Sequence, residues 1–289
     1  MASKQAKIIH AKRIATPKEA TTMIGDFVPE KEPSFRGAAI IYDQDTGELV
    51  AAHLPVQNTR QLRQELVGEK FDKISRASAF SSDSKTFGYA PRRHIIGREG
   101  CAPSRSRRDN PHLDSLLGGL ADECADSMTD FAPNIVEKDR ETLRQIKPEW
   151  RLGERKLWSS GVINKTAQLP YHRDTFNFPA WSAMPVLRRG VRGGYLHIPE
   201  YDLVLPCQDS HACYFKGQEI VHGVTPMQRK NDDSYRFSIV FYALRGMKDC
   251  FTHAEETAYA QRRRSERERD MAKRLSAGDT SIPAATKRK

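Results

Sequence analysis

Hydrophobic and polar positions change their period along the chain, and these changes mark its organisation. Residues 1–33 are polar, mixed in charge and without sustained periodicity, which predicts a loosely ordered N-terminal segment. Apolar runs at 38–43 and 49–54 flank a turn that contains Gly47 and predict a β-hairpin. A short helix is expected to follow over residues 60–67.

The middle of the chain changes from a helical to a strand-like pattern. Apolar residues recur at helical spacing between 113 and 131, and a charged amphipathic pattern continues over 135–146. We expect two helices here, packed on a sheet. From Leu157 onwards, short β-like runs alternate with Gly, Pro and Asp, which favours a sandwich or a barrel.

Two further stretches are rich in arginine. Residues 82–110 contain many Ser, Gly, Pro, Lys and Arg residues and predict a long loop, which is either a phosphate-contacting element or a flexible solvated segment. Residues 254–275 alternate Glu and Arg with few apolar positions. This pattern favours a solvent-exposed helix supported by i,i+4 charge pairs, with phosphate binding as the alternative role.

The overall charge adds a prediction about partners. A net charge of +10 and a pI of about 9.4 favour a polyanionic partner such as DNA, although solubility alone also explains them. No stretch reaches the length of a membrane span and the N-terminus lacks the apolar core of a signal peptide. We expect a soluble intracellular protein, cytoplasmic in a prokaryotic or viral host and nuclear in a eukaryote. The oligomeric state stays open.

The five cysteines are odd in number and scattered, which fits a reducing compartment better than a disulfide framework. Three of the potential metal ligands lie close together, namely Cys207, His211 and Cys213. Their spacing matches no common structural zinc pattern. We therefore interpret the two cysteines as buried thiols on a strand pair.

A different set of residues indicates metal chemistry. His172 and Asp174 are two positions apart, so that on a strand both side chains point to one face. His222 is the candidate third ligand. Two histidines and one carboxylate on one face of an octahedral ion leave three positions open, an arrangement that suits non-haem Fe(II) oxygenases.

The run from Tyr235 to Tyr242 alternates and places Arg236 and Ser238 on the same face of a strand. A buried arginine needs an anionic partner, because an unpaired buried charge is very costly. A carboxylate satisfies the guanidinium bidentately, and Ser238 adds a hydroxyl donor. The sequence thus predicts a clamp for the distal carboxylate of 2-oxoglutarate.

These residues follow the H-x-D…H…R order of the double-stranded β-helix oxygenases that depend on Fe(II) and 2-oxoglutarate. More narrowly, residues 157–245 resemble the TET/JBP family of nucleic-acid base hydroxylases. The matching segments are 171–177, 193–200, 222–226 and 236–242. The resemblance implies an α+β fold with a double-stranded β-helix (jelly-roll) core at 155–245 and flanking helices. This core lies in a domain over 34–250, followed by a basic charged helix and tail at 251–289.

The resemblance also implies roles for individual residues. His172, Asp174 and His222 would hold the iron, and Arg236 would hold 2-oxoglutarate. Asn177 matches an asparagine that lies near the target base in the family, a task for which an amide offers both a donor and an acceptor. An Asx-turn is the structural alternative for this asparagine.

The implied activity is O2-dependent hydroxylation of the 5-methyl group of 5-methylcytosine or thymine in DNA. The alternatives are the same iron chemistry on a protein side chain or small molecule, and a non-catalytic β-helix domain that binds a partner. The chain departs from animal TET domains in lacking their cysteine-rich region. The next arginine after Arg236 is Arg245, nine residues on instead of six, which argues against the alkylation-repair branch.

Overall fold

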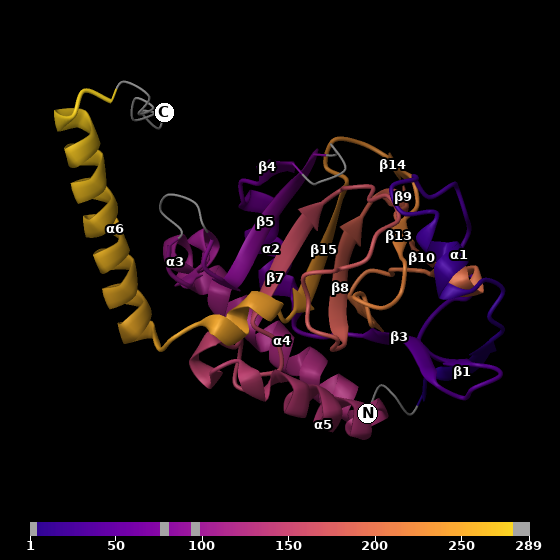
Figure 1. Ribbon diagram of the computed structural model, residues 1–289. Coiled ribbons are helices and arrows are strands. Elements are labelled where there is room, and N and C mark those ends of the chain that lie inside the picture. The colour runs from indigo at the N-terminus through magenta and orange to yellow at the C-terminus, as the bar shows by residue number, and fades with distance from the viewer. Residues whose placement is uncertain (1–4, 76–80, 94–98, 280–289) are drawn as a thin grey trace.

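A mainly antiparallel sheet organises the residues described in this computed structural model, which are 5–75, 81–93 and 99–279 (Figure 1). Ten strands belong to it within those ranges, and only β1 and β2 pair in parallel. The strand order is β1 (Lys7–Ala11), β2 (Ala39–Asp43), β3 (Leu49–Pro55), β12 (His211–Phe215), β8 (Ser182–Arg189), β15 (Tyr235–Tyr242), β7 (Ser160–Lys165), β5 (Ser81–Ala90) and β4 (Asp72–Ser75), with β6 (Ala102–Pro103) paired to β5. Neighbours in this order are often far apart in sequence.

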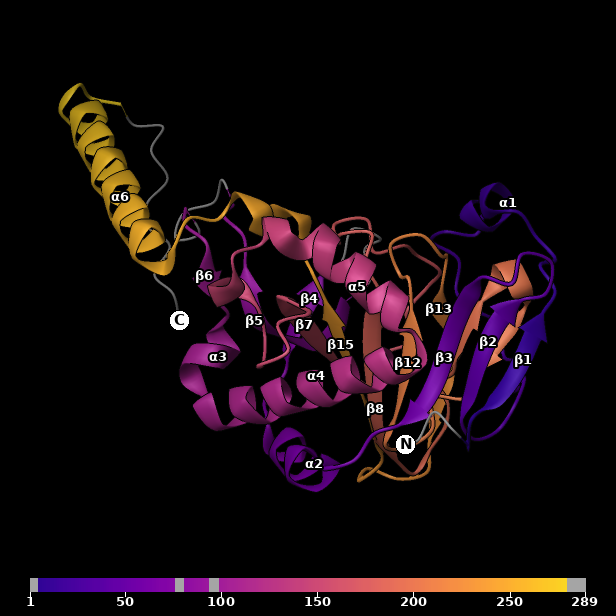
Figure 2. The same cartoon turned by 90° about the horizontal axis from the view of Figure 1, so that it is seen from below.

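Helices cover one face of this sheet (Figure 2). They are α2 (Thr59–Gly68), α4 (Pro111–Phe131) and α5 (Pro133–Thr142), and the largest hydrophobic cluster contains buried residues of all three. The start of α4 shows why the helix forms there. The side chain of Asn110 accepts a hydrogen bond from the N–H of Leu113, and Pro111 occupies the first turn. Short 3₁₀ segments η2 (Leu143–Gln145) and η3 (Pro148–Trp150) follow α5.

Two small sheets face the opposite side. One contains β11 (Leu203–Leu205), β10 (Leu196–Ile198) and β13 (Gly223–Val224), and the other contains β14 (Met227–Arg229) and β9 (Val191–Gly193). A second hydrophobic cluster joins β10 and β11 to β2, β3, β8 and β12 of the main sheet. Alternate residues of β15 therefore point to different environments, with Phe237 in the helix-side cluster and Val240 against the second cluster.

The described N-terminal residues are more structured than their composition predicts. They contain β1 and α1 (Pro17–Thr21), where the sequence predicted a loosely ordered segment. β1 is held by pairing with β2, and the N–H groups of Ile14 and Ala15 donate to the carbonyl of Glu200 within η4 (Pro199–Tyr201). These contacts join residues that are far apart in the sequence, so the local hydrophobic pattern could not predict them.

The prediction of a long loop over 82–110 is wrong for most of its described part. Residues 81–90 form β5, which pairs with both β4 and β7, and α3 (Arg105–Asp109) follows β6. Serine-rich composition was the misleading signal. The hydroxyl of Ser84 donates to Asn164 of β7, so polar side chains of this strand find partners within the sheet. Residues 94–98 of the predicted basic loop lie outside the described part of the chain.

The remaining predicted elements are confirmed: the hairpin as β2 and β3, and the helices as α2, α4, α5 and α6 (His253–Ser276). α6 extends away from the sheet, reached through η5 (Arg245–Asp249), and Glu256 is its buried residue (Figure 1). The fold is thus α+β. Of the helices that the structure describes, none combines the length and apolarity that a membrane crossing requires.

Candidate functional site

His172 and His222 meet at an isolated antiparallel bridge. Each donates its backbone N–H to the carbonyl of the other, at 2.9 and 3.0 Å. The expected regular strand through His172 and Asp174 is therefore absent, and the bridge positions the first histidine instead. The side-chain ligand atoms of His172, Asp174 and His222 nevertheless all lie within 4.8 Å of one another. The structure brings the predicted triad together.

Backbone carbonyls orient both imidazole rings. Nδ1 of His172 lies 2.8 Å from the carbonyl oxygen of Pro170, and Nδ1 of His222 lies 3.0 Å from that of Ile220. A nitrogen that faces a carbonyl carries the proton and donates it, which leaves Nε2 as the free lone pair of each ring. Burial, and then the charge of His172, lower the pKa of His222 to about 4. The ring is neutral at physiological pH, the form that binds a metal.

The carboxylate of Asp174 is positioned by its own backbone and by a glycine. The N–H of Asp174 donates to the carbonyl of Gly217 at 2.9 Å. A Cβ atom at Gly217 would lie 2.6 Å from Oδ2 of Asp174, closer than real Cβ contacts. Gly217 is thus needed to leave the carboxylate its place beside the two rings, a role that the sequence alone did not reveal.

Arg236 lies on β15 and is fully buried. Its exposed fraction is 0%, and Nε, Nη1 and Nη2 have no hydrogen-bond partner among the residues that the structure describes. Gly194 leaves room for the Arg236 side chain, because a Cβ atom at position 194 would lie only 2.8 Å from the Arg236 Cδ. A guanidinium buried without an acceptor is unfavourable, so its surroundings are built for an anion that supplies one. The distal carboxylate of 2-oxoglutarate has the required chemistry.

Cys207 is another neighbour of this arginine. Burial raises the pKa of its thiol, whereas the hydrogen bond with Cys213 and the positive charge of Arg236 act in the opposite direction. The two sulfur atoms are 3.7 Å apart and fully buried, as predicted, but only Cys213 lies in a strand, since Cys207 follows the end of β11. His211 does not join them, since its ring stacks on that of His53.

Ser238 and Asn177, the other two predicted site residues, are both buried. Ser238 is buried two residues along β15 from Arg236, on the same face. Asn177 is 6% exposed, and its backbone N–H donates to the carbonyl of Asp174 at 2.9 Å. The backbone of Asn177 therefore closes the turn after Asp174, and its side chain is not needed for that closure.

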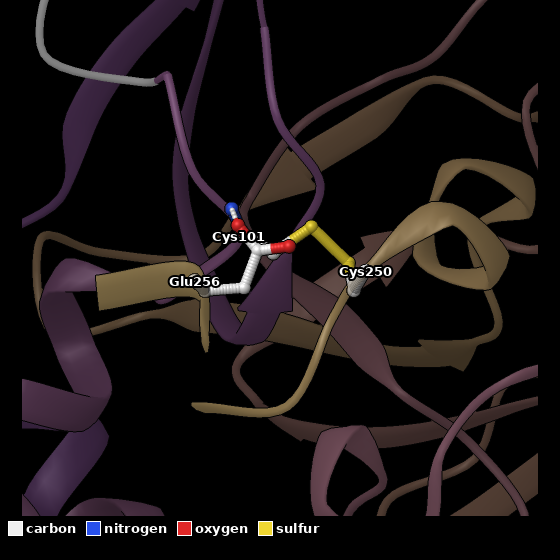
Figure 3. A group of neighbouring side chains, drawn as sticks. All are labelled: Cys101, Cys250 and Glu256. Atoms are coloured by element: carbon white, nitrogen blue, oxygen red, sulfur yellow. Dashed lines mark hydrogen bonds between the residues drawn. A yellow bond between two sulfur atoms is a disulfide. The ribbon is translucent and has the colours of Figure 1, made fainter. Parts of the chain in front are cut away.

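A second group of potential metal ligands lies at the base of α6 and consists of Cys101, Cys250 and Glu256 (Figure 3). The two cysteines form a disulfide, whereas the odd number and the scatter of the cysteines favoured a reducing compartment over a disulfide framework. The carboxylate of Glu256 accepts from the backbone N–H groups of Cys101 and Phe251, each at 2.8 Å, and from Arg92. Because every ligand atom already has a partner, this group is a structural connection and not a metal site.

Comparisons with known proteins add one firm finding. No family model and no curated protein matches the chain. Among solved structures, one described as NgTET1 in complex with 5mC DNA has a TM-score of 0.55 and 14% sequence identity, covering 81% of this chain and 93% of that chain. An oxidoreductase of the 2OG-Fe(II) oxygenase family from Burkholderia pseudomallei covers 83% and 100% at 11% identity, but its TM-score of 0.46 establishes no shared fold. The chain therefore has the fold of a TET structure, in agreement with the family that its sequence resembles.

Proposed function

We propose that this protein is an Fe(II)- and 2-oxoglutarate-dependent dioxygenase that hydroxylates the 5-methyl group of a pyrimidine base in DNA, either 5-methylcytosine or thymine. One observation carries the proposal: a histidine–histidine–aspartate group with free ligand atoms lies in the same fold as a fully buried arginine without an acceptor. Neither half alone would identify the chemistry. Together they supply a metal face and an anion clamp.

The residues of the chain would divide the work. His172, Asp174 and His222 would hold Fe(II) on one face and leave three positions for cosubstrate and oxygen. Arg236, assisted by the Ser238 hydroxyl, would fix the distal carboxylate of 2-oxoglutarate. The iron, when bound with 2-oxoglutarate and O2, supplies the oxidation of the methyl group. We infer that the main and small sheets around these residues correspond to the double-stranded β-helix of such oxygenases.

Three observations support DNA as the substrate. The net charge is +10, the sequence segments around the site resemble the TET/JBP family, and the structure with the shared fold was solved with 5mC DNA. A methyl group within a stacked duplex is out of reach, so the enzyme would extrude the target base. Asn177, three residues after the ligand Asp174, would then contact the polar edge of that base.

The second candidate is the same iron chemistry on a protein side chain or a small molecule, because triad and clamp serve any such substrate. DNA affinity separates the two. A basic protein that contacts several phosphates loses affinity steeply as salt rises, whereas a protein or small-molecule hydroxylase shows no tight, salt-dependent DNA binding. The third candidate, a non-catalytic binding domain, predicts that function survives replacement of Asp174.

Nucleoside mass spectrometry tests the proposal. The protein is incubated with DNA containing 5-methylcytosine and thymine, Fe(II) and 2-oxoglutarate, and the digested nucleosides are analysed. We expect a 5-hydroxymethyl product on one of the two bases with the native protein and none with Asp174→Ala. Consumption of 2-oxoglutarate without formation of a modified base would favour a substrate other than DNA. Activity retained by Asp174→Ala would contradict the assigned metal chemistry.

A further inference from the structure

Phe176 is an exposed aromatic residue beside the metal ligands. Its exposed fraction is 81%, the highest among the large hydrophobic residues in the described part of the chain that are exposed. It follows Asp174 by two positions, so the two Cα atoms are at most about 7.6 Å apart. A lone exposed hydrophobic residue is ordinary on a protein surface. What sets Phe176 apart is its place two residues after Asp174, a member of the candidate metal group.

Hydrogen bonds hold this residue outward. The carbonyl of Phe176 accepts from the backbone N–H of Arg245 at 2.9 Å, and the Arg245 guanidinium donates to the carbonyl of Thr175. The N–H of Asn177 donates to Asp174 at 2.9 Å and closes a turn with Phe176 at its corner. Both neighbours of the ring are thereby fixed to η5 and to the metal ligand. The ring projects from an anchored turn, not from a free loop.

We propose that Phe176 inserts into the DNA base stack at the place that the target base leaves, and so stabilises its extrusion. This inference rests on the proposed function. Extrusion breaks the stacking and pairing of the target base. Apolar side chains that enter the stack offset such losses in other DNA-binding proteins. An exposed aromatic ring that directly precedes Asn177 in the turn after Asp174 is placed to do this while the base lies near the metal.

Insertion makes a specific prediction about substrates. In a fully paired duplex, Phe176 replaces the stacking that the target base gives up. When the target lies opposite an abasic site, extrusion is already cheap and the ring has less to contribute. Loss of the ring should therefore reduce turnover on paired DNA more than on DNA with an abasic site opposite the target.

The test compares the native protein with Phe176→Ala and Phe176→Trp on these two duplexes. Leu275→Ala, which removes a comparably exposed apolar side chain from distant α6, is the control. Stacking of a base on an aromatic side chain strengthens binding by about fivefold to a hundredfold. We expect Phe176→Ala to lower kcat/KM on paired DNA by about tenfold or more and on the abasic duplex by less than about threefold. The tryptophan variant and the control should match the native protein, and the KM for 2-oxoglutarate should stay unchanged in all of them.

Other results contradict the proposal in distinguishable ways. If Phe176→Ala turns over paired DNA like the native protein, or if its kcat/KM falls by the same factor on both duplexes, insertion is wrong while the proposed function stands. If the native protein modifies neither duplex, the proposed function fails and the inference falls with it. A parallel thermal melt shows whether Phe176→Ala is misfolded. If it is, Phe176→Trp provides the test through the ratio of its kcat/KM on the paired duplex to that on the abasic duplex. A ratio that differs from that of the native protein contradicts insertion.

Discussion

Two clusters in this fold contain residue types that bind metals, and they differ in what their atoms already contact. At the base of α6, Cys101 and Cys250 are joined in a disulfide and the Glu256 carboxylate accepts from three donor groups. At the other cluster, the Nε2 atoms of His172 and His222 and the Asp174 carboxylate face one another without bridging groups. In the first cluster, other groups of the chain already occupy the potential ligand atoms. In the second cluster, these atoms are available to bind a metal.

The buried arginines differ in the same way. Arg92 is paired with Glu256, whereas Arg236 is fully buried and none of its nitrogens has an acceptor within the described part of the chain. Proteins satisfy nearly all buried polar groups, so an unsatisfied buried charge indicates a ligand that the chain does not supply. Residue types alone would give both clusters equal weight. Whether the polar atoms of a cluster already have partners distinguishes the structural cluster at the base of α6 from the candidate functional site.

The largest effect should come from removing the carboxylate of the open cluster. Asp174→Ala is expected to lower turnover by more than about a hundredfold, the loss that even outer-shell changes around metals reach. Iron retention, measured on the purified protein by elemental analysis, should fall in parallel. Asp232→Ala removes a fully exposed carboxylate and is the control that should change neither. Normal iron binding by Asp174→Ala would refute the assigned ligand set.

Replacing Arg236 by methionine should have opposite effects on ligand binding and on stability. Loss of a buried charge pair costs about 2–5 kcal/mol, so the KM for 2-oxoglutarate should rise at least about thirtyfold. The free protein should become more stable, because an unpaired buried charge is replaced by an apolar side chain. Thermal melts with and without 2-oxoglutarate check both effects. An Arg236→Met protein that melts lower and still gains stability from 2-oxoglutarate would show that the guanidinium is not the clamp.

In the closed cluster, the same kind of change should affect stability alone. Glu256→Gln leaves Arg92 without its counter-ion and is expected to cost about 2 kcal/mol of unfolding free energy, reduced from the fully buried case because Arg92 is 25% exposed. Glu266→Gln breaks the exposed pair with Arg263 and should cost less than about 1 kcal/mol. Denaturant unfolding measures both. A loss of iron binding or turnover per folded molecule in Glu256→Gln would erase the distinction between the clusters.

The smallest effect concerns Asp139, a buried carboxylate outside both clusters. Burial raises its pKa to about 6, and the nearby Glu219 acts in the same direction. The hydrogen bond from the Trp181 N–H and the charges of Lys216 and Lys138 only partly offset this rise. The folded state therefore holds the proton more tightly, and stability should fall as pH rises from about 4 to about 6. Asp139→Asn keeps an acceptor for Trp181 and should be about 1–2 kcal/mol more stable than the native protein at pH 7.5 but not at pH 4. Equal pH profiles would show that this carboxyl group is not perturbed.

The sequence predicted the proximity of His172, Asp174 and His222 better than it predicted the fold around them. His172, Asp174, His222 and Arg236 were identifiable because their side-chain chemistry and order are constrained by what they would bind. The helix α4 was also predictable from the sequence, because its buried residues recur at the spacing of a helical turn. The strand through the histidine–aspartate pair was not, because a single bridge to His222 replaces it.

What the sequence missed depends on contacts between distant residues. Cys101 and Cys250 are 149 positions apart, and no spacing rule connects them. β5 looked like a loop because its serines are satisfied by a strand some 80 residues later. Gly217 and Arg245 act through the backbone of the loop that carries Asp174, and their sequence neighbourhoods contain no motif that signals this. Such features need the three-dimensional structure.

The measurement that tests the central claim most directly follows oxygen into DNA. The native protein is turned over with ¹⁸O2, Fe(II), 2-oxoglutarate and DNA containing 5-methylcytosine and thymine, and both nucleosides and succinate are analysed by mass spectrometry. We predict a 5-hydroxymethyl pyrimidine that carries the label, in step with succinate, and neither product with Asp174→Ala. Succinate formed without any labelled base, or a labelled base formed by the Asp174→Ala protein, would contradict the account.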